Sequence, residues 1–330
     1  MERLISVENV SKEVGADRPK VDILFGPHVK KADQIPAREL FESSDVFIPE
    51  HPYWNNELKD AYNKVSQGEI TVEDGLKLVR KYTNFPTFEK AQLEMVHGSN
   101  KPIIFADLNT TEPEVESMFQ SLNSLQEAYI QMLVNEKEFA EAIADLRSAV
   151  RDFVKVQKER EGKIAENLEK ILDEAGKDLP QLKNKQEVKI LMTLGGAHTG
   201  LYHLLRGKNI SVKAEFPQMP YLFGFNAELG RRGIFEKEIS EGLLAKAVLD
   251  GAVKTILRQN VKNLSRVSTS QIENFTRIVL DKFSESEAVD LLKKFRQIAN
   301  LQKVEYLKSQ LEARNINFPK TAKELLSLIN

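Results

Sequence analysis

The 330-residue sequence contains no cysteine. This absence excludes disulfide bonds, thiolate metal sites and cysteine nucleophiles, and it suits a reducing compartment. No apolar run approaches the roughly 20 residues that a membrane-spanning helix needs, and the first residues lack the basic and apolar regions of a secretory signal. We therefore expect a soluble, cytoplasmic protein without a membrane partner.

An excess of charge of one sign is also missing. Lys and Arg total 47 and Asp and Glu total 49, which gives a net charge of −2 at neutral pH. This balance gives no electrostatic reason to expect a polyanionic partner. Residues 307–326 vaguely resemble the helices of SAP-like nucleic-acid modules, but a helical hairpin packed on the protein or on a second subunit explains them better. We therefore expect no nucleic-acid partner and leave a homo-oligomer open.

Several familiar motifs are absent as well. The sequence has no P-loop, G-x-G-x-x-G, H-E-x-x-H or G-x-S-x-G in a context that would support it. Hydrophobic residues at 41% and charged residues at 29% nevertheless indicate an ordinary globular chain. A functional site must therefore be sought among residues that lie far apart in the sequence.

Short apolar runs predict the strands of a sheet. Residues 21–25, 45–48, 102–106 and 188–194 are each brief, β-branched or aromatic, and followed by a turn-forming or polar residue. Residues 210–214 are a weaker fifth candidate. Helical patterns lie between these runs, so we predict an α/β fold with a mostly parallel sheet flanked by helices.

Two long segments are predicted to be helical. From about 111 to 175 apolar residues recur every three or four positions, which predicts a helical insertion of two long antiparallel helices. From 236 to 330 no strand is apparent, and Ser270-x-x-Glu273 and Ser284-x-x-Glu287 have the form of capping boxes. We therefore predict an α/β domain over residues 1–235, including the insertion, and an all-helical C-terminal region over residues 236–330.

Three polar residues follow predicted strands. His28 stands in Gly26-Pro27-His28, Glu50 ends the second predicted strand, and His198 stands in Gly195-Gly196-Ala197-His198. Ligands of open α/β sheets bind outside the carboxyl ends of the strands. Two imidazoles and a carboxylate can bind a divalent metal such as Mn, Co or Zn, or one histidine can act as a general base that Glu50 orients. Either histidine alone could simply be packed in a loop, but their shared position favours a site.

Arg160 is a fourth candidate for a different reason. It stands four and eight residues before Ile164 and Leu168, and it therefore continues their buried stripe. An arginine that points into a core needs an anionic partner. Arg160 either extends to the rim of the core or reaches a carboxylate such as Glu50 or an anionic ligand, and we favour the second. Asp107 is either a cap or turn residue or a further member of this group.

The remaining candidates are weaker. His97 precedes a glycine at a predicted helix end, His203 lies on a predicted helix, and His51 should point away from Glu50 because neighbours on an extended chain point in opposite directions. Residues 216–235 form an aromatic, proline- and glycine-containing loop. This loop is either a substrate wall or a packed connection to the helical region.

These residues, in this order, resemble those of the superfamily that includes the TraB and TIKI proteins, the erythromycin esterases and the ChaN-type haem-binding lipoproteins. The matching elements are Gly26-Pro27-His28, Pro49-Glu50, Arg160-Glu161 and Gly195-Gly196-Ala197-His198. The resemblance covers roughly residues 20 to 206. The first motif departs from the family pattern because it is G-x-H instead of G-x-x-H, with Pro27 where many relatives carry an acidic residue.

The resemblance implies a hydrolase, with or without a metal, that acts on a small-molecule or peptide substrate. It implies His28, Glu50, Arg160 and His198 as catalytic residues, with His28, Glu50 and His198 as the candidate metal ligands. Arg160 would hold an anionic group or stabilise a developing oxyanion. The alternative is a non-enzymatic protein that binds haem or another small molecule in the same pocket.

Overall fold

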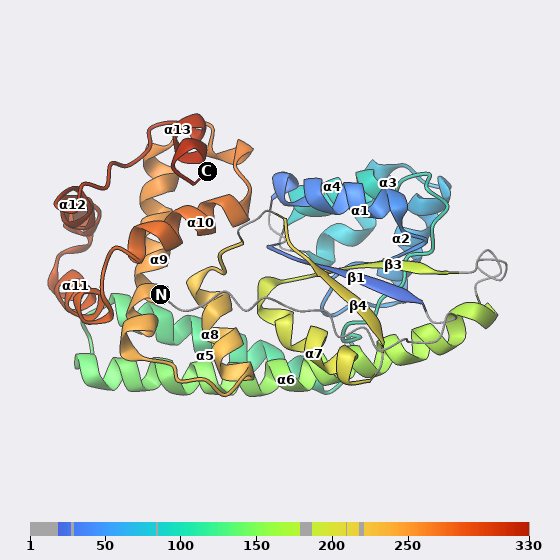
Figure 1. The fold of residues 1–330 in the computed structure, drawn as a ribbon, viewed down its shortest axis with the longest axis horizontal. Coiled ribbons are helices and arrows are strands. Elements are labelled where there is room, and N and C mark those ends of the chain that lie inside the picture. Colours follow the sequence, from blue (N-terminus) through green and yellow to red (C-terminus); the bar gives the residue numbers. More distant parts are fainter. Residues whose placement is uncertain are drawn as a thin grey trace.

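The sheet of the protein is parallel throughout. The structure, a computed structural model, describes residues 19–27, 30–83, 85–178, 187–208, 210–217 and 221–329, with the backbone alone for residues 174–178, 300 and 301. The strands are β1 (Lys20–Phe25), β2 (Val46–Ile48), β3 (Lys189–Leu194) and β4 (Ser211–Glu215). They pair in the order β2-β3-β1-β4. The predicted α/β class is confirmed (Figure 1).

Helices make up most of the remaining described chain. The first group is η1 (Lys31–Gln34), α1 (Ile35–Ser43), α2 (Asn56–Gln67), α3 (Val72–Val79), η2 (Arg80–Tyr82) and α4 (Pro86–Val96). The middle group is α5 (Glu114–Leu133), α6 (Phe139–Asp178), η4 (Gly196–His198), α7 (Thr199–Gly207) and α8 (Phe225–Ile234). The C-terminal group is α9 (Glu241–Asn260), η5 (Leu264–Arg266), α10 (Thr269–Leu280), α11 (Glu285–Gln297), α12 (Asn300–Glu312) and α13 (Ala322–Ile329), which confirms the predicted helical C-terminal region.

Helices cover both faces of the sheet, because the strands carry apolar residues on both faces. On one face Ile23 packs with Leu168 of α6 and with residues of α7. On the other face Leu24 and Phe47 pack with Phe41 of α1 and with residues of α2 and α4. Polar side chains that approach the sheet are therefore brought together at the ends of the strands.

Helix α6 connects the two halves of the molecule. Its first half packs through Leu146 and Val150 into a core shared with the C-terminal helices, and its second half packs through Ile164 and Leu168 against the sheet. A helix of 40 residues is about 60 Å long, and Figure 1 shows α6 along the whole molecule with α5 beside it. The predicted pair of long helices is confirmed. Between its two apolar contacts, α6 carries buried polar residues.

One predicted strand is wrong. Residues 102–106 contribute a single isolated bridge, from Ile103 to Phe47 of β2. Phe47 donates to the carbonyl of Pro102 at 3.1 Å and accepts from Ile104 at 3.0 Å. Because β2 is itself only three residues long, it offers no continuous edge along which the segment could form a ladder.

One predicted capping box is also wrong. Ser268 caps α10 and Gln271 completes the box, two residues before the predicted pair of Ser270 and Glu273. Ser268 and Ser270 each have a Gln or Glu three positions later, so the local pattern fits either serine as the cap. Asp33 of η1 decides between them, because it accepts from the backbone N–H of Thr269 at 2.6 Å. Glu273 therefore lies one turn inside the helix.

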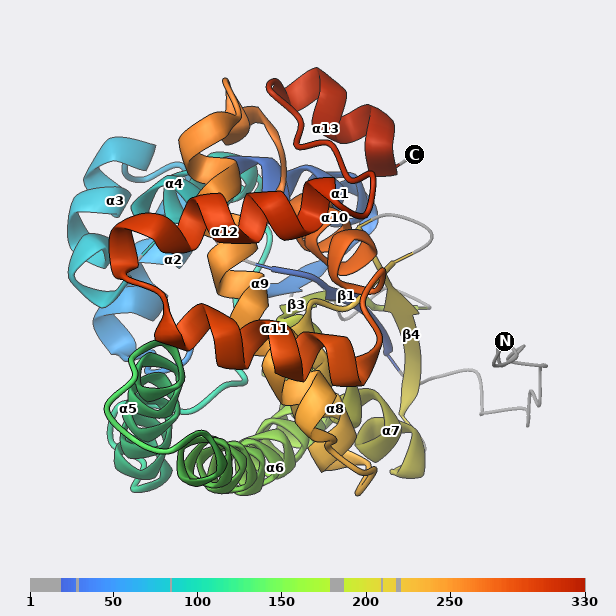
Figure 2. The same ribbon diagram turned by 90° about the vertical axis from the view of Figure 1, so that its left-hand side faces the viewer.

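No helix in the described part of the chain is long and apolar enough to span a membrane. In the end-on view of Figure 2, α11 and α12 cross in front of α9, and the α5–α6 pair lies below them. The C-terminal helices, α5, α8 and the first half of α6 share one apolar core.

Candidate functional site

The carboxyl ends of β2 and β3 bring Glu50 and His198 together. Glu50 follows β2 by two residues, and its backbone N–H donates to the hydroxyl of Thr193 at 3.3 Å. One carboxylate oxygen accepts from the backbone N–H of Gly195. The other lies 3.1 Å from Nε2 of His198, whose side chain is almost fully buried. The parallel sheet therefore places both predicted residues in one site.

Arg160 joins this pair from the buried side of α6. Its Nη2 donates to Glu50 at 3.1 Å, its Nε donates to Asp107 at 2.8 Å, and Nη2 also contacts the second oxygen of Asp107. Burial by itself would lower the pKa of the guanidinium, but the carboxylates of Asp107 and Glu50 raise the pKa above its usual value. Arg160 thus reaches carboxylates inside the protein and does not extend to the rim.

Asp107 combines both roles considered for it. Its Oδ1 accepts from the backbone N–H of Leu108 at 2.8 Å, as in a turn, and also from Arg160. The indole N–H of Trp54 donates to the Asp107 carbonyl oxygen at 2.7 Å. These bonds hold the carboxylate, and hence the guanidinium, in one orientation.

The sequence analysis missed two residues of the site, Gln157 and Glu161. The amide nitrogen of Gln157 lies 2.6 Å from Nδ1 of His198, and a carboxylate oxygen of Glu161 lies 3.6 Å from the same nitrogen. Burial raises the pKa of Glu161 to about 7, against the opposing charges of His198 and Arg160. Both residues continue the apolar stripe of α6 at intervals of three and four, so their polar character at buried positions is the signal that could have identified them.

The site opens into a cavity of about 740 Å³, which we call the main cavity. Residues of α5, α6 and α8 supply mostly apolar walls, among them Met118, Phe119, Leu122, Val150, Phe153, Ala227 and Leu229. The polar lining includes Glu50, Gln157, Arg160, His198 and Glu273. A largely apolar cavity with a few convergent polar groups is the usual form of a small-molecule site.

The segment predicted as a loop over residues 216–235 is only partly a loop. Residues Phe225–Ile234 form α8, because Phe225 and Leu229 are spaced by one turn and both are buried. Tyr221 and Asn226 line the main cavity, which favours the interpretation as a wall. Pro220 lies outside the described residues.

The other histidines lie apart from this group or outside the described chain. His28 is outside the described residues, so its role stays a prediction. His51 is buried and lies 3.6 Å from Glu89. His97 is the C-cap of α4, and His203 is exposed on α7.

The described residues do not by themselves form a metal site. Within those ranges, no group of three His, Cys, Asp or Glu side chains could hold a metal ion. Glu50 and His198 offer two ligands, and the third predicted ligand is His28. The guanidinium of Arg160 forms ion pairs with both Glu50 and Asp107. Binding of Mn, Co or Zn, and binding of haem, therefore stay predictions, and the chemistry proposed below uses the described residues alone.

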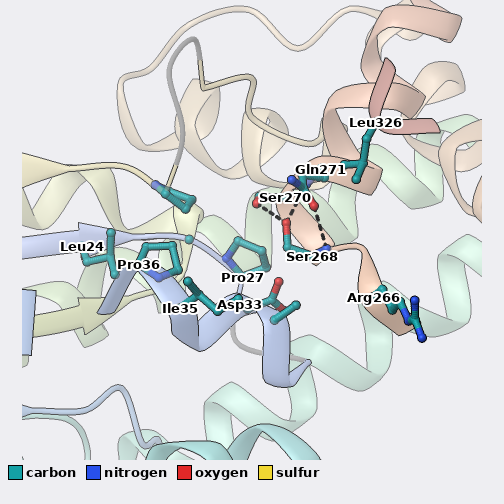
Figure 3. Close-up of a pocket in the computed structure, with 13 residues that line it drawn as sticks. Leu24, Pro27, Asp33, Ile35, Pro36, Arg266, Ser268, Ser270, Gln271 and Leu326 are labelled. Carbon is teal, nitrogen blue, oxygen red and sulfur yellow. Dashed lines mark hydrogen bonds between the residues drawn. The ribbon is translucent and has the colours of Figure 1, made fainter. Parts of the chain in front are cut away.

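A second cavity, of about 250 Å³, lies beyond the end of β1 beside α10 (Figure 3). Several of its polar groups, among them Asp33, Ser268 and Gln271, are bonded to one another or to the backbone. Asp33 accepts from the backbone N–H and the hydroxyl of Thr269 at 2.6 and 2.8 Å, and Ser268 bonds with Gln271 to cap α10. We interpret this region as the joint between the sheet and the C-terminal helices.

Fold and site together define an α/β protein with a buried histidine, arginine and carboxylate site beside an apolar cavity. The chain matches no family model, no curated protein and no solved structure. The resemblance to the TraB, TIKI and erythromycin esterase superfamily therefore stays a prediction from short motifs. The function is inferred below from the geometry of the site.

Proposed function

We propose that the protein is a hydrolase that cleaves an ester or amide bond of a small molecule held in the main cavity. One observation carries the proposal: His198, Glu50 and Arg160, which lie far apart in the chain, converge at the wall of that cavity. A general base, a group that orients it and an oxyanion donor are the minimum set for such a hydrolysis.

His198 would act as the general base. Glu50 lies 3.1 Å from Nε2 and would accept a hydrogen bond from Nε2–H, which leaves Nδ1 as the basic nitrogen. The amide of Gln157 lies 2.6 Å from Nδ1, so it would have to turn aside for the attacking water to reach this nitrogen, and it would then help to hold that water. His198 would take a proton from this water as it attacks the substrate carbonyl, and Glu50 would stabilise the resulting imidazolium.

Arg160 would stabilise the oxyanion that forms on the carbonyl oxygen. Within the described chain its Nε and Nη2 donate to Asp107 and Glu50, whereas Nη1 donates to no described residue. The guanidinium also lines the main cavity. A donor whose orientation is fixed in advance lowers the barrier because it need not reorganise as charge develops.

Glu161 would stabilise the protonated form of His198. Its pKa of about 7 allows it to gain or lose a proton near neutral pH, and it lies 3.6 Å from Nδ1 of His198. When the tetrahedral intermediate collapses, His198 would return its proton to the leaving alcohol or amine. The products are a carboxylic acid and that leaving group.

Hydrolysis of p-nitrophenyl butyrate, followed by release of p-nitrophenolate, tests the proposal. The His198→Ala variant should lose about 10²- to 10⁴-fold in kcat/KM, the range for removal of a general base. His203→Ala is the matched control, because His203 is exposed on the following helix and should retain full activity.

A wild-type rate no higher than that of His198→Ala would refute the proposal. Assays after treatment with a chelator separate its two versions. Activity that survives the chelator supports chemistry by the described residues alone. Activity that is lost and then restored by Mn²⁺ or Zn²⁺ supports the version in which His28 completes a metal site with Glu50 and His198.

A further inference from the structure

Carboxylates outnumber cations in the part of the wall that α9 and α10 form. Lys254 faces both Asp250 and Glu273, so this group carries a net negative charge when Glu273 is ionised. In a cavity with apolar walls such an imbalance favours a cationic ligand and disfavours an anionic one.

Glu273 brings negative charge to the cavity from α10, whereas Arg160 belongs to α6. Figures 1 and 2 both show α10 above α8 and α6 below it. The carboxylate of Glu273 lines the cavity and is only 3.6 Å from the ammonium of Lys254. Lys254 lies closer to Asp250, at 2.7 Å. One cation thus serves two carboxylates, and the charge of Glu273 is only partly balanced.

The surroundings of Glu273 leave room for its carboxylate. Glu273 faces the backbone of Gly224, where a Cβ atom would lie 2.8 to 3.1 Å from the atoms of the carboxyl group. A larger residue at position 224 would therefore displace the carboxylate. Burial raises the pKa of Glu273 to about 7, and a bound cation would favour its ionised form.

Two tyrosines line the same cavity. The hydroxyl of Tyr129 donates to Asn226 at 2.6 Å. Burial raises the pKa of the Tyr221 phenol, and the charge of the nearby Glu273 carboxylate raises it further. Aromatic rings together with a carboxylate are the groups that recognise ammonium ions in proteins.

We propose that the main cavity binds an apolar ligand that carries an ammonium group, and that this group lies beside Glu273, near Tyr129 and Tyr221. This inference deepens the proposed function by naming the class of its substrate, an ester or amide of a lipophilic amine or amino alcohol. The claim that the protein cleaves such a substrate rests on the proposed function, whereas the claim that the cavity binds an ammonium group does not. Asp107 and Glu50 already pair with Arg160 and lower its net attraction for an anionic ligand, while Nη1 stays available to the substrate carbonyl.

Isothermal titration calorimetry with three small probes tests the binding. Benzyltrimethylammonium is the cation and carries no titratable proton, benzyl alcohol is the neutral probe and benzoate is the anion. We expect the cation to bind about tenfold more tightly than either of the other probes. The Glu273→Gln variant, which keeps the size of the side chain, should lose about tenfold in affinity for the cation alone.

Two further variants make the test specific. Glu127→Gln removes a carboxylate from an exposed position of α5 and should leave the affinity unchanged. Gly224→Ala keeps every charge but displaces the Glu273 carboxylate, and it should also weaken binding of the cation. The Gly224 variant decides the question if Glu273→Gln does not fold.

The outcomes separate this inference from the proposed function. Equal affinity of the wild type for the three probes, or equal binding of the cation by wild type and by Glu273→Gln or Gly224→Ala, would overturn the inference. Selective binding of the cation by a wild type that does not hydrolyse p-nitrophenyl butyrate or benzoylcholine would support the subsite and refute the hydrolase. Faster hydrolysis of benzoylcholine than of its neutral analogue 3,3-dimethylbutyl benzoate, with the preference lost in Glu273→Gln, would support both.

Discussion

Replacement of Arg160 by Met should be among the most destabilising single changes in this protein. Met retains most of the length of the side chain but none of its charge. The substitution leaves Glu50 and Asp107, whose side chains are 15% and 2% exposed, as adjacent carboxylates without their cation. Breaking a buried ion pair by removal of one partner costs about 3–5 kcal/mol, because the remaining charge is left uncompensated. We therefore expect the free energy of unfolding to fall by about that amount.

Urea denaturation followed by tryptophan fluorescence measures this loss. The protein has a single tryptophan, Trp54, and its indole donates to the Asp107 carbonyl, so the signal reports on the site itself. For a chain of this size the dependence on urea is about 3 kcal/mol per M or more, and the midpoint should fall by about 1 M. Arg151→Met, at an exposed position of the same helix, should leave the midpoint nearly unchanged.

A second substitution tests whether the uncompensated charge is the cause. Asp107→Asn in the Arg160→Met background removes one of the two carboxylates that have lost the guanidinium, so the double variant should be more stable than Arg160→Met alone. A loss below about 1 kcal/mol for Arg160→Met, the range of an exposed pair, would refute the reasoning. A double variant less stable than the single one would refute it as well.

Two further predictions concern the contact of Glu161 with α7. The pKa of Glu161 is raised to about 7 in the folded protein, so its contribution to stability is favourable below about pH 4.5 and is lost as the pH rises through 7. The free energy of unfolding of Glu161→Gln should therefore rise relative to wild type by up to about 3 kcal/mol between pH 5 and pH 8, and parallel pH–stability curves would contradict this. The variant should also have a lower kcat, because Glu161 lies beside His198. A Cβ at Gly200 would overlap a carboxylate oxygen of Glu161 and lie 2.7 Å from Cγ2 of Ile234, so Gly200→Ala should lower the free energy of unfolding by about 1–3 kcal/mol. A Cβ at Gly207, in the same helix, would meet no atom within 4 Å, so Gly207→Ala should be neutral or stabilising. Equal melting temperatures for the two variants would contradict the prediction, because they would show that the structure relieves the overlap at Gly200.

The local pattern of the sequence was sufficient for the class of fold. Short β-branched runs that end in a turn located the buried strands β1, β2 and β3, because buried parallel strands must be apolar on both faces, and a weaker run located β4. The run at 102–106 forms only an isolated bridge. Apolar residues spaced by three and four positions located α5 and α6, because one face of each helix is buried. That spacing also placed Arg160 inside the protein, because its position in the stripe is set by the helix alone.

Only the tertiary structure decided how the site is composed. The partners of Arg160 are 53 and 110 positions away, and no local pattern records which carboxylate a buried arginine meets. Glu273 has the form of a capping residue in the sequence, but Asp33, 236 positions before Thr269, helps to fix the start of α10 and thereby places Glu273 in the cavity wall. Helical and strand periodicity are properties of neighbours along the chain, whereas charge pairing and cavity walls depend on which distant segments pack together.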